Sequence, residues 1–298
     1  MQTWKIGSAT VTRIEEMVAP TDVVVEKFLA GVDRERFKRH LDWMAPTYYD
    51  PQRDRFITSN HSWLVRSGGR TILVDACAGN HKDRPFLPKF NQLDTPFLQR
   101  LKAAGVTPGD IDLVLCTHLH CDHVGWNTRL ENGRWVPTFP KAKYLFSRVE
   151  AEFWTPDAIR RRGSDSRRMV IYEDSVSPVI AAGQAELIET THDIDSRLLV
   201  RPAPGHTPGQ VLLDLVDGGR TGVFCGDAIH HPVQVYEPFW TSHADEEPDV
   251  ARATRRQLLE RCADSGALLF PTHFAAPHVA AIERKGEGFV PKFVHPGA

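Results

Sequence analysis

The stretch Thr117-His118-Leu119-His120-Cys121-Asp122-His123-Val124-Gly125 concentrates three imidazoles and one carboxylate in a short segment. It follows residues 111–116, an apolar run typical of a buried strand, so the polar cluster begins where a strand ends. Imidazole nitrogens and carboxylate oxygens are ligands for zinc, iron or manganese. The first two histidines are spaced to chelate one ion, and the aspartate and third histidine can reach a second. The stretch therefore predicts a metal site.

Three more polar residues follow apolar runs that read as strands. His206 lies in Pro204-Gly205-His206-Thr207-Pro208-Gly209, Asp227 follows Gly226, and His273 follows Thr272. The preceding runs are residues 198–200, 221–225 and 267–270. Four strand ends would thus bring seven candidate ligands to one place.

The order His-x-His-x-Asp-His, Gly-His-Thr-Pro-Gly, Gly-Asp and a late histidine resembles the metallo-β-lactamase-fold hydrolases. The resemblance extends from about Trp63 to the end of the chain. It implies an α/β (α+β) fold, an αβ/βα four-layer sandwich of two mixed β-sheets with helices outside. It also implies that two Zn²⁺ ions bind per chain, although the same ligands accept iron, manganese or cobalt. The implied ligands are His118, His120 and His206 for one ion, Asp122, His123 and His273 for the other, and Asp227 for both.

The same resemblance implies a reaction. A hydroxide between the ions would attack a carbonyl carbon, since metal coordination lowers the pKa of water from 15.7 to about 7. Asp122 would also receive or shuttle a proton. The family places a supporting aspartate at Asp75, where a turn or capping role is the alternative. The best-known zinc β-lactamases carry a cysteine where Asp227 stands, which argues against penicillin hydrolysis.

Within the superfamily, Asp122 beside His123 with a bridging Asp227 resembles the lactonase-like and glyoxalase-like hydrolases. Residues 278–291 are similar to the end of the lactonase and methyl-parathion-hydrolase branch. One position departs from the pattern: acyl-homoserine lactonases carry a tyrosine three residues after the bridging aspartate, and this chain has His230. His230 can donate a proton to a leaving alkoxide, or it can line the pocket.

We therefore expect a dinuclear zinc hydrolase, an esterase or lactonase acting on a lactone or other carboxylic ester, with Asp122 and His230 as catalytic residues. The alternatives are a phosphotriester or thioester hydrolase of the same fold and a mononuclear iron enzyme like the persulfide dioxygenases. A nuclease of this fold fits less well, because a formal net charge of −2 provides no general attraction for nucleic acid. A non-enzymatic binding module would leave seven ligands without a purpose.

Composition indicates a soluble globular protein. Of 298 residues, 41% are hydrophobic and 25% are charged. The start of the sequence has no long apolar stretch, so we expect neither a signal peptide nor a membrane segment. Five scattered cysteines do not form a disulfide framework and fit a reducing cytoplasm. The expected partner is a small-molecule substrate, without nucleic acid or membrane.

We expect residues 1–298 to form a single domain. Residues 20–58 mix aromatic residues, prolines and a charged helical stretch, and are predicted to form a cap over the site or a homodimer contact. Residues 155–185 are Arg-rich and read as a polar insertion. Residues 62–75 predict a hairpin with a Gly-Gly turn. A helix is expected from Pro96 to Gly105, with Thr95 as its cap.

Overall fold

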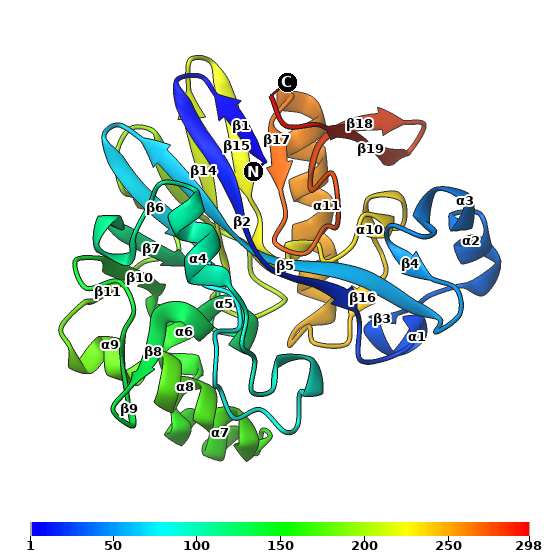
Figure 1. Cartoon of the computed structure of the whole chain (residues 1–298). Coiled ribbons are helices and arrows are strands. Elements are labelled where there is room, and N and C mark those ends of the chain that lie inside the picture. Colours follow the sequence, from blue (N-terminus) through cyan, green and yellow to red (C-terminus); the bar gives the residue numbers. More distant parts are fainter. Residues whose placement is uncertain (1, 298) are drawn as a thin grey trace.

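Two mixed β-sheets form the centre of the molecule in the computed structural model, which describes residues 2–297 (Figure 1). The first sheet has eight strands in the order β1-β2-β5-β6-β7-β10-β11, with β4 paired to β5. Its strands are β1 (Thr3–Ile6), β2 (Ala9–Pro20), β4 (Tyr49–Asp50), β5 (Arg55–Ser67), β6 (Arg70–Val74), β7 (Leu113–Cys116), β10 (Lys143–Ser147) and β11 (Ala185–Ile188). The pairs β6–β7, β7–β10 and β10–β11 are parallel, and the others are antiparallel.

The second sheet has seven strands, listed here in their spatial order. They are β12 (His192–Asp193), β13 (Leu198–Pro202), β14 (Val211–Asp217), β15 (Arg220–Phe224), β17 (Leu268–Phe270), β18 (Val279–Lys285) and β19 (Gly288–Val294). Only the pair β15–β17 is parallel among these described strands. Two small ribbons pair β3 (Leu29–Ala30) with β16 (Thr241–Ser242), and β8 (Thr128–Glu131) with β9 (Arg134–Pro137).

Helices cover the outer faces of the sheets and connect the strands (Figure 1). The α-helices are α1 (Val25–Phe28), α2 (Arg34–Lys38), α3 (Leu41–Met44), α4 (Phe97–Ala103), α5 (Cys121–Val124), α6 (Arg148–Phe153), α7 (Pro156–Arg162), α8 (Met169–Ser175), α9 (Ser177–Ala181), α10 (Val233–Tyr236) and α11 (Pro248–Ser265). The 3-10 turns are η1 (Pro88–Phe90), η2 (Pro108–Asp110), η3 (Gly125–Asn127), η4 (Ser166–Arg168) and η5 (Gly226–Ala228).

Alternation along the strands explains the layers. In β7, Leu115 packs in the core between the two sheets, whereas Val114 and Cys116 face the core under the helices. In β15, Phe224 packs between the sheets and Val223 faces α11. Successive strand residues point to opposite faces, so a sheet buried on both faces needs apolar residues at both positions. The predicted four-layer sandwich of two mixed sheets is confirmed.

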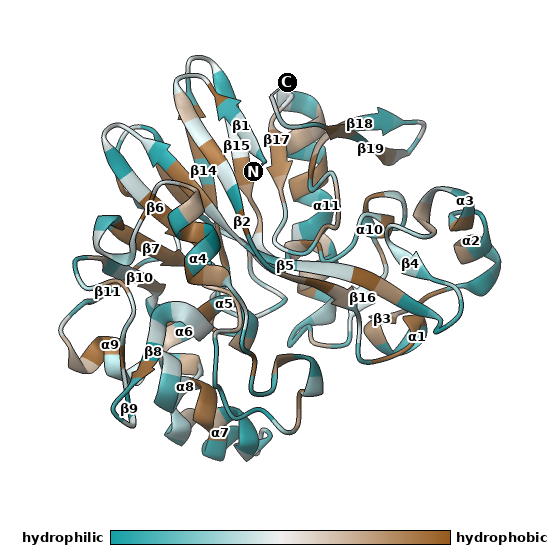
Figure 2. Cartoon of the chain, in the orientation of Figure 1, coloured by the Kyte–Doolittle hydropathy of each residue, from teal (hydrophilic) through white to brown (hydrophobic). Residues whose placement is uncertain are grey.

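Hydropathy follows the same layers. Figure 2 shows apolar residues concentrated along the interior strands, and mostly hydrophilic residues at the turns that connect strand ends. All five cysteines are buried and unbonded to one another in the described chain, as expected for small core side chains. Across residues 2–297, the helices lack the combination of length and apolar character that crossing a bilayer requires.

The predicted hairpin is present as β5 and β6, joined by Gly68 and Gly69 in the left-handed region. The predicted cap of the next helix was wrong. Helix α4 begins at Phe97, Pro96 occupies the N-cap position, and no side chain caps the helix. Thr95 instead donates its backbone N–H to the side chain of Asn80, at 2.8 Å, so it fixes the preceding loop.

The two segments singled out by composition both lie beside the candidate site. Residues 20–58 contain α1 to α3 and form a small aromatic core around Phe37 and Phe56, which packs against Val233 and Trp240. Residues 155–185 contain α7, α8 and α9, whose inward faces add Ile159 to the core below the first sheet. The Arg-rich composition of the second segment describes its outer surface and, at Arg167 and Arg168, part of the lining of the candidate site.

Candidate metal centre and active site

The loop that follows β7 is fixed by bonds to two neighbouring segments, residues 75–77 and α6. The backbone N–H of Thr117 donates to Asp75 at 2.8 Å, and that of Leu119 donates to the buried Glu150 at 3.1 Å. The N–H of Gly125 donates to the carbonyl of Cys77 at 2.7 Å. These bonds hold the imidazoles of the loop in fixed directions before any ligand binds.

All seven predicted metal ligands lie together at the ends of β7, β13, β15 and β17. They fall into two groups within which the ligand atoms lie no more than 4.8 Å apart. One group is His118, His120, His206 and Asp227; the other is Asp122, His123 and His273. The structure therefore brings together every residue of the predicted set, and in the predicted division.

Asp227 lies between the two groups. Its Oδ2 is 3.3 Å from Nε2 of His206 and 3.8 Å from Nε2 of His118. Its Oδ1 is 3.2 Å from Nε2 of His123 and 3.0 Å from Nε2 of His273. Each carboxylate oxygen thus faces one group of imidazoles, which is the arrangement that a ligand shared by two ions requires.

The donor atoms fit divalent cations. Nε2 of His118 is buried without a hydrogen-bond partner in the described chain, an unfavourable state that a bound cation would relieve. Burial and neighbouring imidazoles hold the pKa of His118 and of His120 well below the usual range, so both rings are in the neutral, metal-binding form. Imidazoles and carboxylates together suit zinc and similar metals.

Two buried carboxylates orient histidines of the site by contacting the Nδ1 atom of each ring. Asp75 Oδ2 lies 2.9 Å from Nδ1 of His123, and Asp245 Oδ1 lies 2.8 Å from Nδ1 of His206. A partner on Nδ1 fixes the tautomer and directs Nε2 toward the centre of the site. The predicted supporting role of Asp75 agrees with this geometry. Asp245 plays the same part for the other group.

These two carboxylates give a matched pair of variants. We expect Asp75→Asn to weaken metal binding at the His123 group and Asp245→Asn at the His206 group, each by roughly 10- to 100-fold, because the imidazole loses its fixed orientation. Titration against a chelator with a competing zinc dye would resolve the two affinities. Loss of the same affinity in both variants, or of neither, would contradict this assignment of one carboxylate to each group.

His230 lies on the His206 side of Asp227. Its Nε2 is 3.2 Å from Asp227 Oδ2, and its backbone N–H donates to Gln234 at 2.8 Å. Its Nδ1 is buried without a partner, and burial lowers its pKa. His230, His206 and Asp245 also form a third group of potential ligands. The sequence predicts His230 at the site, and in the structure it lies there.

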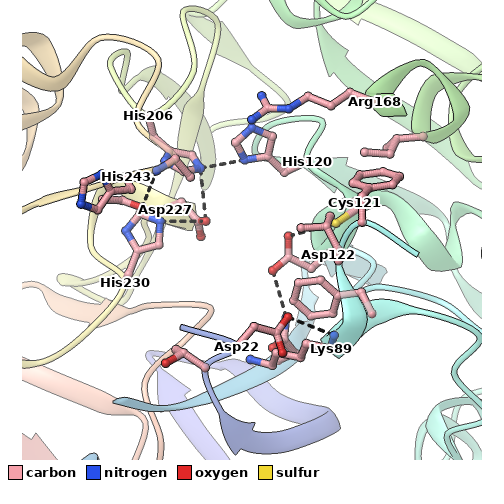
Figure 3. Close-up of a pocket in the computed structure, with 18 of the residues that line it drawn as sticks. Asp22, Lys89, His120, Cys121, Asp122, Arg168, His206, Asp227, His230 and His243 are labelled. Atoms are coloured by element: carbon pink, nitrogen blue, oxygen red, sulfur yellow. Dashed lines mark hydrogen bonds and ion pairs between the residues drawn. The ribbon is translucent and has the colours of Figure 1, made fainter. Parts of the chain in front are cut away.

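A pocket with a volume of about 430 Å³ opens above these residues (Figure 3). His120, Asp122, His206, Asp227, His230 and His273 form its polar floor. Its walls are mainly apolar and come from residues 86–90, residues 171–176 and the 20–58 segment, together with Leu119 and Trp154; the apolar residues of the three segments are Val23, Phe28, Phe86, Leu87, Phe90, Ile171, Tyr172 and Val176. A concave, largely apolar site of this size with a few convergent polar groups suits a small organic molecule.

This fold, with a His/Asp cluster at its strand ends, defines a metal-dependent hydrolase. Residues 57–273 match the model of the metallo-beta-lactamase superfamily. This span covers well over half of the chain, so the protein belongs to the metallo-β-lactamase superfamily.

Solved structures share the fold over nearly the whole chain. The chain is similar to the hydrolase AbOPH of the beta lactamase superfamily, with a TM-score of 0.84, 24% identity, and coverage of 100% of this chain and 98% of that chain. It is also similar to AidC, described as a dizinc quorum-quenching lactonase, with a TM-score of 0.78, 21% identity and 99% and 98% coverage. A probable metal-dependent hydrolase from Staphylococcus aureus gives a TM-score of 0.77, 17% identity and 98% and 99% coverage.

Similarity to curated relatives is more local. Ribonuclease Z of Mycobacterium avium (strain 104) is 38% identical over 78 residues, which is 26% of this chain and 22% of that protein. Ribonuclease Z of Mycolicibacterium paratuberculosis is 37% identical over a span of the same length. The chain therefore aligns with less than a quarter of the length of these relatives.

Some residues of the site were not predicted. Asp245 lies in the acidic run Asp245-Glu246-Glu247, which resembles an exposed loop, and only the fold brings it to His206. Asn60 donates to Asp122 Oδ2 at 3.1 Å, and its place in the middle of β5 gave no signal. Lys89 follows a proline in a short turn, where lysines are usually exposed.

Proposed function

We propose that this protein is a dinuclear zinc hydrolase that opens a lactone or cleaves another carboxylic ester. The observation that carries the proposal is the position of Asp227 between two groups of imidazoles on the floor of a largely apolar pocket. His118, His120 and His206 would hold one ion, and Asp122, His123 and His273 the other, with Asp227 shared. When bound, the ions supply an activated water nucleophile and polarise the substrate carbonyl.

The protein groups have separate tasks. The apolar walls hold the acyl portion and exclude water from the floor of the pocket. Asp122, which accepts a hydrogen bond from Asn60, would accept the proton that the attacking water loses. His230 lies on the same floor, with Nε2 3.2 Å from Asp227 Oδ2, and would donate an N–H to the oxygen of the leaving group. Lactone or ester chemistry is favoured because AidC, which has the same fold over 99% of this chain, is a lactonase.

Acid release in a pH-stat tests the proposal. Zinc-loaded protein would be offered γ-lactones, aryl esters, a glutathione thioester and a phosphotriester. We expect turnover of lactones or carboxylic esters to be the fastest in this panel. Faster turnover of the phosphotriester or thioester would assign those reactions instead. If no compound of the panel released acid, the proposal would be overturned. The next measurement would then be oxygen uptake by iron-loaded protein with a persulfide as substrate.

The leaving-group role of His230 predicts a selective loss. We expect His230→Phe to lower the turnover of lactones and alkyl esters by roughly 100-fold, because general acid catalysis contributes about 10²- to 10⁴-fold. Aryl esters should lose less, since a phenolate leaves without help. Zinc content should stay at the wild-type level. His243→Phe is the matched control, because His243 lines the same pocket but bonds to the backbone of Glu26.

An equal loss on aryl and alkyl esters would contradict the role of His230 as a proton donor. Loss of zinc from the His230→Phe variant would instead make this histidine a metal ligand, in line with the third group that it forms with His206 and Asp245.

A further inference from the structure

Lys89 places a positive charge on the wall of the pocket, next to the group formed by Asp122, His123 and His273. It lies in η1, and its side chain lines the pocket. Its Nζ donates to Oγ1 of Thr58 at 2.7 Å, which uses one of three N–H groups. Among residues 2–297, no carboxylate oxygen lies within 4.0 Å of this ammonium.

The other basic side chains of the pocket are already neutralised or hydrated. Arg167 pairs with Asp165 at 2.6 Å, and Arg168 pairs with Glu246 at 2.8 Å. Lys27 is exposed at the rim, where water solvates its charge. Lys89 is partly buried, and burial lowers its pKa even though Asp122 and Asp22 act in the opposite direction. Its ammonium is therefore the pocket cation that gains most from a bound anion.

The position of Lys89 separates this charge from the reacting bond. Figure 3 shows Arg168 beside His120, and Lys89 on the opposite side of the pocket, beyond Asp122. An anionic group held by Lys89 would lie past the His123 group, whereas the ester bond of a bound substrate would lie over Asp227. The ammonium lies next to one hydroxyl, and the Asp22 carboxylate accepts the backbone N–H of Lys89 at 3.0 Å, so this wall suits a singly charged carboxylate better than a phosphate dianion.

We propose that Lys89 binds a carboxylate carried by the substrate, so that the preferred substrate is an anionic ester or lactone rather than a neutral one. This inference rests on the proposed ester or lactone hydrolysis. The carboxylate is a second group on the acyl portion of the substrate, separate from the one that hydrolysis releases.

A matched pair of esters tests the preference. Mono-4-nitrophenyl glutarate carries a carboxylate, and methyl 4-nitrophenyl glutarate is its neutral counterpart. We expect zinc-loaded wild-type protein to have the higher kcat/KM for the anionic ester. Lys89→Met should lower the ratio of the two values by about 10- to 100-fold, mainly through KM, as expected for loss of a charged hydrogen bond.

Two further variants control for packing and for general charge. Lys89→Arg keeps the charge and should retain most of the preference. Lys27→Met removes an exposed cation of the same pocket and should leave the ratio unchanged. If Lys89→Met lowered both kcat/KM values equally, or if Lys27→Met had the same effect, the proposal would be wrong.

Calorimetry separates this proposal from the proposed reaction. The probes are glutaric acid monoanilide, whose amide bond resists hydrolysis, and its methyl ester, each titrated into zinc-loaded protein. Tighter binding of the acid by wild type, lost in Lys89→Met and kept in Lys89→Arg, would support the anion site even if no ester were hydrolysed. Equal binding of acid and methyl ester by wild type would overturn it, even if both esters were hydrolysed rapidly.

Discussion

Asp227→Ala should reduce turnover by roughly a thousandfold or more, because the activated water that two metal ions supply is lost, and metal coordination raises the hydroxide fraction of water by roughly eight powers of ten. Asp227 is the carboxylate that faces both imidazole groups, with one oxygen toward each. Its removal affects both sites at once, which no other single ligand in the set can do. Zinc content, measured by mass spectrometry after dialysis, should fall from about two ions per chain to below one.

Stability measurements distinguish loss of metal from loss of fold. A ligand that binds only the native state raises the melting temperature. Zinc should therefore stabilise wild-type protein and leave the melting temperature of Asp227→Ala nearly unchanged, while the circular dichroism of the two proteins stays alike. Asp214→Ala removes another buried carboxylate, one that pairs with Arg261 on a different face, and should keep its zinc. Wild-type turnover in Asp227→Ala would show that the dinuclear mechanism is incorrect.

Gly125→Ala should damage the same site through the backbone. A Cβ at this position would lie 1.8 Å from the carbonyl oxygen of Ala78 and 2.5 Å from the backbone nitrogen of Gly79. The segments 76–79 and 125–126 cannot separate easily, because the N–H of Gly125 donates to the carbonyl of Cys77 and that of Trp126 to the carbonyl of Ala76, both at 2.7 Å. We expect a loss of about 3 kcal/mol in the free energy of unfolding, near the upper end of the usual cost of overpacking.

Residues 76–79, which the new Cβ would displace, directly follow Asp75 and hydrogen-bond to the loop that carries His123. Gly125→Ala should therefore also weaken zinc binding at the His123 group. Urea unfolding and zinc titration would measure the two effects. Gly109→Ala is the matched control, since a Cβ there meets only Thr107, at 3.8 Å. Wild-type stability together with wild-type zinc affinity in Gly125→Ala would contradict the close approach of these two loops.

The ligand set could be predicted because its members follow short apolar strands in a fixed order. His206, Asp227 and His273 lie three or four residues after the ends of β13, β15 and β17, and strand ends converge in a sheet sandwich. The residues behind the ligands left no such pattern. Asp245 reaches His206 across 39 positions of sequence, and its acidic neighbours suggest a solvated loop.

The walls of the pocket were predicted least well, for a related reason. The sequence of residues 155–185 is dominated by charged residues that face solvent, whereas the few apolar residues that line the pocket, Ile171, Tyr172 and Val176, occur without a clear period. Lys89 is the opposite case, a charged residue that is partly buried. Its partial burial depends on η1 folding over Thr58, and nothing in the local sequence indicates that contact.

A crystal structure of zinc-loaded protein, with anomalous data collected above and below the zinc edge, tests the central claim most directly. We predict two anomalous peaks on the floor of the pocket, one beside His118, His120 and His206 and the other beside Asp122, His123 and His273, with Asp227 contacting both. A single peak at full zinc loading, or two peaks without Asp227 between them, would contradict the dinuclear site.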